Sequence, residues 1–192
     1  MKKKIVILGA TGSIGSTTLD LIQKDKKNFE VILLTANSNY KKLFKLANNF
    51  NCINLIIHNK NKYHEAVKKN KNKKLNILNN TKDFLKNFKG RVDYTMSSIT
   101  GISGLEPTLD AISFSKCIAI ANKESIICGW HLIEKKLKKF KTNFIPVDSE
   151  HFSIWTLIKS YKITQIEKII ITASGGPFLN LPISKFKNIT VE

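Results

Sequence analysis

The sequence predicts an α/β protein built on a doubly wound parallel sheet. Short apolar runs alternate with segments of helical spacing along most of the chain, and a glycine-rich turn directly follows the first apolar run. The 192 residues, of which 42% are hydrophobic, suffice for one well-packed core and the beginning of a second unit. Strand–helix alternation favours parallel pairing, because parallel neighbours need a crossover between them.

The first part of the chain has the pattern of a β–α–β unit that then continues. We expect, in order, a strand Lys4–Leu8, a loop Gly9–Gly15, a helix Ser16–Ile22, a strand Phe29–Thr35, a helix around Lys41–Phe50 and a strand Leu55–His58. The next segment, Asn59–Asp83, is dominated by Lys and Asn. We therefore interpret it as solvated surface with one helix near Tyr63–Lys69.

The alternation then resumes and predicts a second unit. We expect a strand Val92–Ser97, a loop Ser98–Gly104, a helix Pro107–Phe114, a strand Cys117–Ala121, a helix near Glu124–Phe140, a strand Asn143–Val147, a helix His151–Ile158 and a strand Lys168–Thr172. A Lys-rich segment meets a new strand between Phe140 and Asn143. We therefore predict a first domain over 1–141 and the incomplete beginning of an α+β domain over 142–192.

Charge, hydropathy and cysteines limit the possible functions. The net charge of +18 admits a basic nucleic-acid-binding module, but the lysines are scattered and not interleaved with aromatic residues, so we expect no specific nucleic-acid binding. No apolar run approaches the roughly 20 residues that span a bilayer, so no membrane association is expected. The three cysteines are far apart and odd in number, which indicates reduced thiols and a cytoplasmic location.

The glycine loop favours a dinucleotide. It reads Gly-Ala-Thr-Gly-Ser-Ile-Gly over 9–15, between a strand and a helix, where glycines let the backbone approach a pyrophosphate at the helix N-terminus. The alternative is a glycine-rich turn without a ligand. The second strand runs into Asn37, Ser38 and Asn39, with Lys41 and Lys42 following and no carboxylate to grip the ribose 2′-hydroxyl of NAD. This composition favours NADPH.

Three further motifs follow predicted strands, where open α/β sheets bind ligands. In Ala-Asn-Lys-Glu-Ser, Asn122 and Lys123 are either ligand-binding or a helix N-cap and a solvated side chain. Asp148 and Glu150 could share one divalent cation, or could instead cap and complement the following helix.

The third motif, around Ser174, contains two glycines before a proline and fits either a phosphate nest or an ordinary turn. His151 is not expected to bind a metal, since no second His is spaced to join it.

Taken together and in order, four motifs closely resemble one family along the whole chain. They are Gly-Ala-Thr-Gly-Ser-Ile-Gly, Ala-Asn-Lys-Glu-Ser, Pro-Val-Asp-Ser-Glu-His and Ala-Ser-Gly-Gly-Pro-Phe, and the family is the 1-deoxy-D-xylulose 5-phosphate reductoisomerases. The resemblance implies a Rossmann-type NADPH-binding domain followed by a catalytic domain that binds metal and substrate. It also implies dependence on Mg or Mn, a homodimer in the full-length form and a place in the methylerythritol phosphate route to isoprenoids. The implied reaction rearranges and reduces 1-deoxy-D-xylulose 5-phosphate to 2-C-methyl-D-erythritol 4-phosphate.

The resemblance also implies roles for individual positions. The residues implied to bind NADPH are Thr11, Gly12, Ser13 and Ile14 at the pyrophosphate, Asn37, Ser38 and Asn39 at the adenosine end, and Asn122 and Glu124 beside the cofactor. The implied catalytic residues are Lys123, Asp148 and Glu150, of which Asp148 and Glu150 resemble two of three metal ligands. The implied substrate contacts are Lys123, Ser149, Glu150 and Ser174.

Two departures from the family qualify this expectation. Asn37 and Ser38 stand where the family usually has Gly and then a basic residue. Asn tolerates a left-handed turn, but the 2′-phosphate loses a cation unless Lys41 or Lys42 replaces it.

The chain also has roughly half the family's length, on the scale of one domain and a fraction. A substrate lid, the third metal carboxylate and a C-terminal helical domain are missing from it. We therefore expect either a truncated portion of an active enzyme or a short product of a decayed gene. In both cases the chain alone should bind NADPH weakly without turnover.

Overall fold

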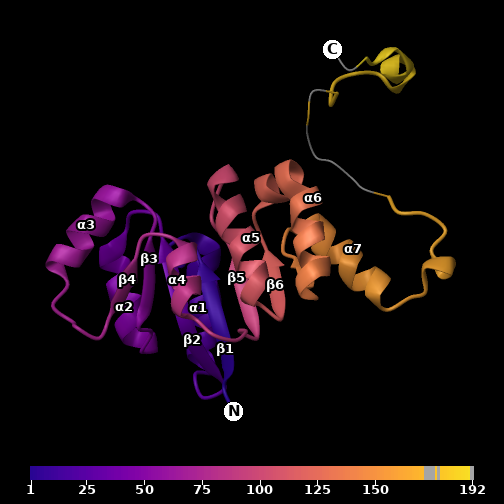
Figure 1. Cartoon of the computed structure of the whole chain (residues 1–192). Coiled ribbons are helices and arrows are strands. Elements are labelled where there is room, and N and C mark those ends of the chain that lie inside the picture. The colour runs from indigo at the N-terminus through magenta and orange to yellow at the C-terminus, as the bar shows by residue number, and fades with distance from the viewer. Residues whose placement is uncertain (171–175, 177, 191–192) are drawn as a thin grey trace. The chain divides into compact units, whose positions relative to one another are not determined.

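A computed structural model describes residues 1–170, 176 and 178–190. By packing, the chain divides into two compact units, Met1–Phe152 and Ser153–Glu192. The first unit is built on a seven-stranded sheet of order β4-β3-β2-β1-β5-β6-β7 (Figure 1), in which every neighbouring pair is parallel. Its strands are β1 (Lys3–Leu8), β2 (Phe29–Ala36), β3 (Asn54–Ile57), β4 (Asn76–Leu78), β5 (Tyr94–Ser97), β6 (Cys117–Ile120) and β7 (Asn143–Pro146). The predicted doubly wound parallel sheet is confirmed.

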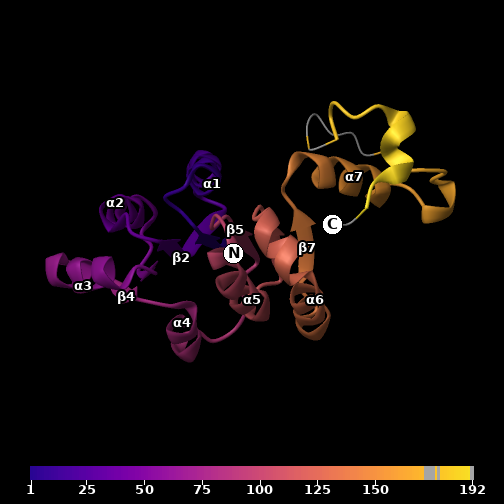
Figure 2. The same ribbon diagram turned by 90° about the horizontal axis from the view of Figure 1, so that it is seen from above.

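Helices cover both faces of this sheet. They are α1 (Ser13–Lys24), α2 (Tyr40–Phe50), α3 (Lys60–Lys69), α4 (Thr81–Asn87), α5 (Leu105–Phe114) and α6 (Lys123–Phe140). A further helix, α7 (Ser149–Lys159), follows β7 and continues into the second unit. Seen from above, α1 and α2 lie on one side of the sheet and α4, α5 and α6 on the other (Figure 2). The strand order reverses direction after β4, so the crossovers before and after it run along opposite faces.

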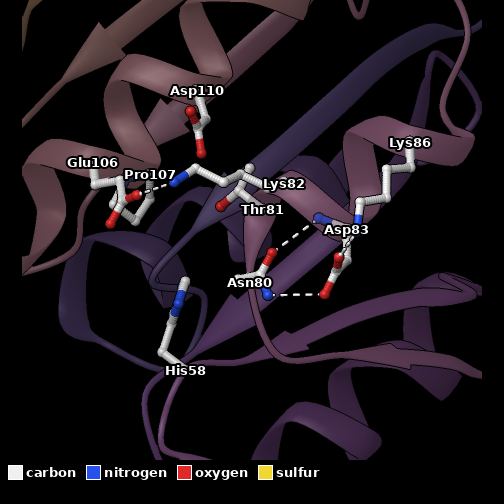
Figure 3. A pocket seen from close by; sticks show the side chains of 9 residues that line it. All are labelled: His58, Asn80, Thr81, Lys82, Asp83, Lys86, Glu106, Pro107 and Asp110. Atoms are coloured by element: carbon white, nitrogen blue, oxygen red, sulfur yellow. Dashed lines mark hydrogen bonds and ion pairs between the residues drawn. The ribbon is translucent and has the colours of Figure 1, made fainter.

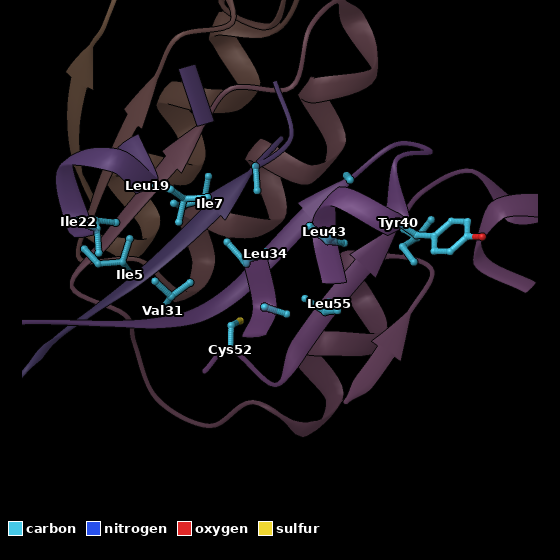
Figure 4. Packing of buried hydrophobic residues seen from close by; sticks show 14 of the residues in the cluster. Ile5, Ile7, Leu19, Ile22, Val31, Leu34, Tyr40, Leu43, Cys52 and Leu55 are labelled. Atoms are coloured by element: carbon cyan, nitrogen blue, oxygen red, sulfur yellow. The ribbon is translucent and has the colours of Figure 1, made fainter. Parts of the chain in front are cut away.

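The core follows from the two-residue period of the strands. In β1, Ile5 and Ile7 join the apolar cluster beneath α1 and α2, whereas Val6 and Leu8 join the cluster beneath α4, α5 and α6. The first of these clusters is drawn in Figure 4. Because both faces are covered, the strand is apolar at every buried position rather than alternating, which is typical of parallel sheets.

The Lys- and Asn-rich segment 59–83 contains more regular structure than predicted. Its predicted helix is present as α3, but the segment also contains the edge strand β4 and the start of α4. Only three residues of β4 pair with β3, and they include Ile77 and Leu78. Phe84 of α4 is buried in the core. A three-residue strand is too short for periodicity to reveal it.

The seventh strand belongs to the first compact unit. β7 pairs with β6 from Cys117↔Asn143 to Ile120↔Pro146, so the packing boundary falls after Phe152, later than the expected break between Phe140 and Asn143. In the second unit the structure describes two short 3₁₀ helices, Ile163–Gln165 and Ile183–Asn188. The predicted strand at Lys168–Thr172 is not formed over residues 168–170, and its remainder lies outside the described residues. Strand hydrogen bonds need a neighbouring strand, and none is found among the residues described in this unit.

Candidate functional site

The glycine loop has a backbone path that two of its glycines make possible. Gly9 has φ +84°, and a side chain there would lie 2.8 Å from the carbonyl oxygen of Ser98. At Gly15, a Cβ atom would collide with the carbonyl oxygen of Gly9, so α1 can pack closely only with glycine at this position. The end of β2 holds the loop in place, because Thr35 accepts the Gly9 N–H on its Oγ1 at 2.9 Å and the Ala10 N–H on its carbonyl oxygen at 2.8 Å.

The N-terminus of α1 is open to a ligand. The helix begins at Ser13, three residues earlier than predicted, and its N-cap, Gly12, supplies no side-chain hydrogen bond. The first backbone N–H groups of a helix have no partner within the helix and carry a partial positive charge, so they attract phosphate. Gly12, Ser13 and Ile14 are exposed and Thr11 is half-buried. The predicted loop residues therefore surround a position that fits a dinucleotide pyrophosphate.

At the end of β2, Asn37 does not adopt a left-handed backbone conformation. Positive φ occurs outside glycine at Asn51 and Lys141 in the described part of the chain, so Asn37 needs no left-handed conformation. Asn39 caps α2 by accepting the Lys42 N–H on Oδ1 at 3.0 Å. This turn forms without the backbone freedom of the family's glycine.

Lys42 connects α2 to the glycine loop, whereas Lys41 is exposed. The Nζ of Lys42 donates to the Thr11 carbonyl oxygen at 3.0 Å and to Ser16 Oγ at 2.8 Å. A half-buried ammonium group therefore lies against the loop that would bind the pyrophosphate. From the sequence, Lys42 could be predicted only as a substitute cation at the 2′-phosphate, because its contact with the loop depends on how α2 packs beside α1.

At the end of β6, Asn122 has a structural role. The residue is buried, and its Oδ1 caps α6 by accepting the Ser125 N–H at 2.6 Å. Its Nδ2 donates to the Gly101 carbonyl oxygen at 2.7 Å and also to the Ile99 carbonyl oxygen. Asn122 therefore fixes the loop after β5 to the start of α6. Its hydrogen bonds are those of a helix N-cap, which was the structural alternative to ligand binding.

Lys123 and Glu150 bring two of the predicted motifs together. Lys123 Nζ lies 3.6 Å from Glu150 Oε2, and both side chains are more than half exposed. One residue follows β6 and the other follows β7, which are parallel neighbours. Their contact places the lysine motif beside the carboxylate motif at the carboxyl edge of the sheet.

Asp148 is half-buried at the start of α7 and is already hydrogen-bonded. Its Oδ1 accepts the His151 backbone N–H at 3.0 Å and lies 2.6 Å from His151 Nδ1. Burial alone would raise the pKa of Asp148, but the two hydrogen bonds from His151 and the nearby positive charges outweigh it and hold the pKa below its usual value. Asp148 is therefore a carboxylate at neutral pH.

The donor set fits a divalent cation only in part. No group of three His, Cys, Asp or Glu side chains that could hold a metal ion occurs among the described residues, so Asp148 and Glu150 form an incomplete set. Mg²⁺ is commonly held by one or two carboxylates together with water and substrate oxygens.

The predicted substrate contact Ser174 lies outside the described residues. In the part of the chain that is described, no helix is long and apolar enough to cross a membrane.

Two family models match this chain over most of its length. The family model described as 1-deoxy-D-xylulose 5-phosphate reductoisomerase matches residues 5–129, and the model of that enzyme's C-terminal domain matches residues 144–192. The reductoisomerase of Pelagibacter ubique is 55% identical over 99% of this chain and 50% of its own length. That of Clostridium novyi is 39% identical with the same coverage. The chain thus spans about half the length of the curated relatives it matches.

Solved structures agree with the sequence relatives. The reductoisomerase of Zymomonas mobilis in complex with NADPH superposes with a TM-score of 0.80 at 33% identity, over 99% of this chain and 50% of that one. A reductoisomerase in complex with NADPH, fosmidomycin and magnesium superposes with a TM-score of 0.75 at 30% identity, over 98% of this chain and 49% of that one. The chain belongs to the family of 1-deoxy-D-xylulose 5-phosphate reductoisomerases.

Proposed function

We propose that this chain provides the NADPH-binding domain and the beginning of the catalytic domain of a 1-deoxy-D-xylulose 5-phosphate reductoisomerase. The single observation that carries the proposal is the contact between Lys123 and Glu150, at the same sheet edge as the open N-terminus of α1. Ligands of open parallel sheets bind along this edge. The proposed reaction converts 1-deoxy-D-xylulose 5-phosphate to 2-C-methyl-D-erythritol 4-phosphate. We assign the cofactor role to 1–141 and the metal and substrate role to 142–192.

NADPH is the proposed cofactor, with the N–H groups from Thr11 to Ile14 holding its pyrophosphate. Asn37, Ser38 and Asn39 follow β2, next to the loop in the sheet, and would contact the adenosine half. Asn122 would act mainly by holding the loop after β5, since its amide is already bonded, while Glu124 lies beside it on α6. The NADPH complex of the Zymomonas mobilis relative supports this proposal.

Asp148 and Glu150 are the proposed holders of a divalent cation, Mg or Mn. When bound, the cation supplies a Lewis acid and NADPH supplies the hydride. Lys123 would stabilise negative charge that develops on a substrate oxygen, which its position beside Glu150 supports. Ser149 and Ser174 would contact the substrate. A homodimer of the full-length protein and a cytoplasmic location complete the proposal.

The direct test is titration of the 192-residue chain with NADPH and with NADH, followed by an assay with 1-deoxy-D-xylulose 5-phosphate and Mg²⁺. We expect saturable binding of NADPH that is tighter than that of NADH. We expect no turnover, because the described residues supply only two of the metal carboxylates. A chain that does not bind NADPH would contradict the cofactor assignment. Tight, sequence-specific DNA binding at physiological salt would instead favour a nucleic-acid-binding module.

A further inference from the structure

Two buried hydroxyl groups connect the end of β5 to the start of α5. Oγ of Ser97, the last residue of β5, lies 2.7 Å from Oγ1 of Thr108, and Thr108 Oγ1 donates to the Gly104 carbonyl oxygen at 2.6 Å. Both side chains are fully buried. A threonine hydroxyl has a single proton, so the proton between the two side chains comes from Ser97. The hydrogen bonds therefore run in one direction, from Ser97 through Thr108 to Gly104.

This hydroxyl pair fixes both ends of the loop that joins β5 to α5. The loop covers 98–104 and ends in a 3₁₀ turn, Ile102–Gly104, which continues directly into α5. A threonine that bonds the carbonyl group four residues before it is common in helices and acts only locally. Here the further bond to Ser97 extends the connection from the helix to the strand. The carbonyl group at the end of the loop is thus tied to the residue that precedes the loop.

Asn122 holds the same loop from α6. Its Nδ2 donates to the Gly101 carbonyl oxygen at 2.7 Å and also to that of Ile99. Gly104 leaves room for this amide, since a Cβ atom there would lie 2.5 Å from Asn122 Nδ2 and 2.7 Å from the Ile99 carbonyl oxygen. The loop is therefore restrained both by α5 and by α6.

On its outer side, the first turn of α5 contacts α4 through an exposed ion pair. Lys82 Nζ lies 2.6 Å from Glu106 Oε1, beside a polar pocket of about 450 Å³ (Figure 3). Exposed ion pairs stabilise little, because water and salt screen the two charges. The buried hydroxyl pair is therefore the stronger restraint on this turn and on the loop before it.

The restrained loop lies beside the glycine loop. β1 lies between β2 and β5 in the sheet, and the Ser98 N–H and Oγ both donate to the Leu8 carbonyl oxygen, at 3.0 and 2.8 Å. Open parallel sheets bind ligands where the strand order changes direction in this way. A dinucleotide whose adenosine half extends from the glycine loop toward β2 must extend its nicotinamide half toward β5.

We propose that Thr108 is a positioning residue, which through Gly104 fixes the loop after β5 as the surface for the nicotinamide half of NADPH. Its buried side chain does not contact the cofactor, so it acts only through the loop. Ser97 acts with it as the donor to its hydroxyl oxygen. This inference rests on the proposed function. It adds two residues that no motif of the sequence distinguished.

The test compares matched substitutions in the 192-residue chain. Thr108→Val removes the hydroxyl and keeps the shape of the side chain, whereas Thr108→Ser keeps the hydroxyl. Ser97→Ala, which removes the other hydroxyl, is an independent second variant. Thr95→Val is the control, since Thr95 is also fully buried in β5 and its Oγ1 lies 2.6 Å from one hydroxyl, that of Ser115. Ser115 follows the last residue of α5, at the end of that helix opposite to the loop.

Three ligands separate the two halves of the cofactor. They are NADPH, reduced nicotinamide mononucleotide, and 2′-phospho-ADP-ribose, which has no nicotinamide. Dissociation constants are measured by fluorescence titration for the two reduced nucleotides and by calorimetry for 2′-phospho-ADP-ribose. Thermal unfolding shows whether each variant is folded, and amide hydrogen exchange over 99–104 shows whether the loop has loosened.

We expect Thr108→Val to weaken binding of NADPH and of the mononucleotide roughly five- to tenfold, the value of one hydrogen bond. Amide exchange over 99–104 should become faster, and the affinity for 2′-phospho-ADP-ribose should not change. Thr108→Ser should bind like the unsubstituted chain, and Ser97→Ala should show the same selectivity as Thr108→Val with a smaller effect. Thr95→Val should lower the unfolding temperature about as much as Thr108→Val but leave all three affinities unchanged.

A folded Thr108→Val variant that binds NADPH with unchanged affinity would overturn the positioning role and leave the cofactor assignment intact. Equal weakening of 2′-phospho-ADP-ribose binding would also overturn it, since the effect would not be confined to the nicotinamide half. If Thr108→Val does not fold, the same two outcomes for Ser97→Ala decide. Failure of the unsubstituted chain to bind NADPH would overturn the proposed function and this inference with it.

Discussion

At the glycine loop, single residues determine how closely backbone segments can pack. The glycine pattern could be identified from the sequence because glycine has few substitutes where a Cβ atom would collide with backbone, as at Gly15. The contact of Lys42 could not be predicted in the same way. Thirty-one positions separate Lys42 from Thr11, and only the packing of α2 beside α1 brings them together.

Lys42→Met should weaken NADPH binding by roughly tenfold or more, because it removes a charge-assisted hydrogen bond to the loop and a positive charge near the pyrophosphate. Lys45→Met is the matched control, since it removes the same charge from an exposed position of α2, and it should change affinity less than twofold. Titration of both variants with NADPH at fixed ionic strength measures the difference. Equal effects of the two substitutions would mean that Lys42 acts only through the net charge of the protein.

At the scale of helices and strands, most elements could be predicted because each contains enough apolar residues to indicate a helix or a strand. The edge strand β4 and the short helix α4 were missed, since three and seven residues give no reliable period. Capping residues were ambiguous for a different reason. The residue types that cap helices also bind ligands, so Asn122 fitted both interpretations until its three hydrogen bonds were located.

Asn122→Ala should lower the free energy of unfolding by about 2–4 kcal/mol. It removes the cap of α6 and leaves two loop carbonyl groups without their amide donor. Asn59→Ala is the comparison, since Asn59 is an exposed cap that makes the same kind of bond to the Lys62 N–H at 3.0 Å. That substitution should cost about 1 kcal/mol. Urea unfolding of both variants measures the difference, and equal losses would show that the loop contacts of Asn122 add nothing.

The contact between α2 and α3 should make stability depend on pH. Glu65 accepts hydrogen bonds from Lys62, Lys69 and the buried Tyr40 hydroxyl, which lower its pKa from 4.5 to about 2. The folded state therefore binds this proton less readily than the unfolded state, so the stabilisation is present above pH 4.5 and is lost as pH falls toward 2. Glu65→Gln should unfold at a lower temperature than the unsubstituted chain at pH 7. The gap should close between pH 4.5 and 2, whereas a gap that stayed constant to pH 2 would exclude this carboxylate as its source.

For the molecule as a whole, the order of the strands determines which motifs meet. Three of the four polar clusters, at 9–15, 122–124 and 148–150, follow strands of the sheet, and parallel pairing brings the ends of those strands to one side. The sequence could not show which clusters become neighbours, because neighbours in this sheet are often distant in sequence. Lys123 and Glu150 meet because β6 pairs with β7, and His58 meets Ala36 because β3 pairs with β2.

The most direct test of a single cofactor-binding edge is amide hydrogen exchange of the chain with and without saturating NADPH. We predict slower exchange in two segments that are far apart in sequence, 11–16 at the start of α1 and 122–126 at the start of α6. Residues at the amino-terminal ends of the strands, such as 25–28 before β2 and 89–92 before β5, should exchange at unchanged rates. Protection confined to one of the two segments, or spread equally over both edges, would contradict the convergence of these strand ends on one cofactor.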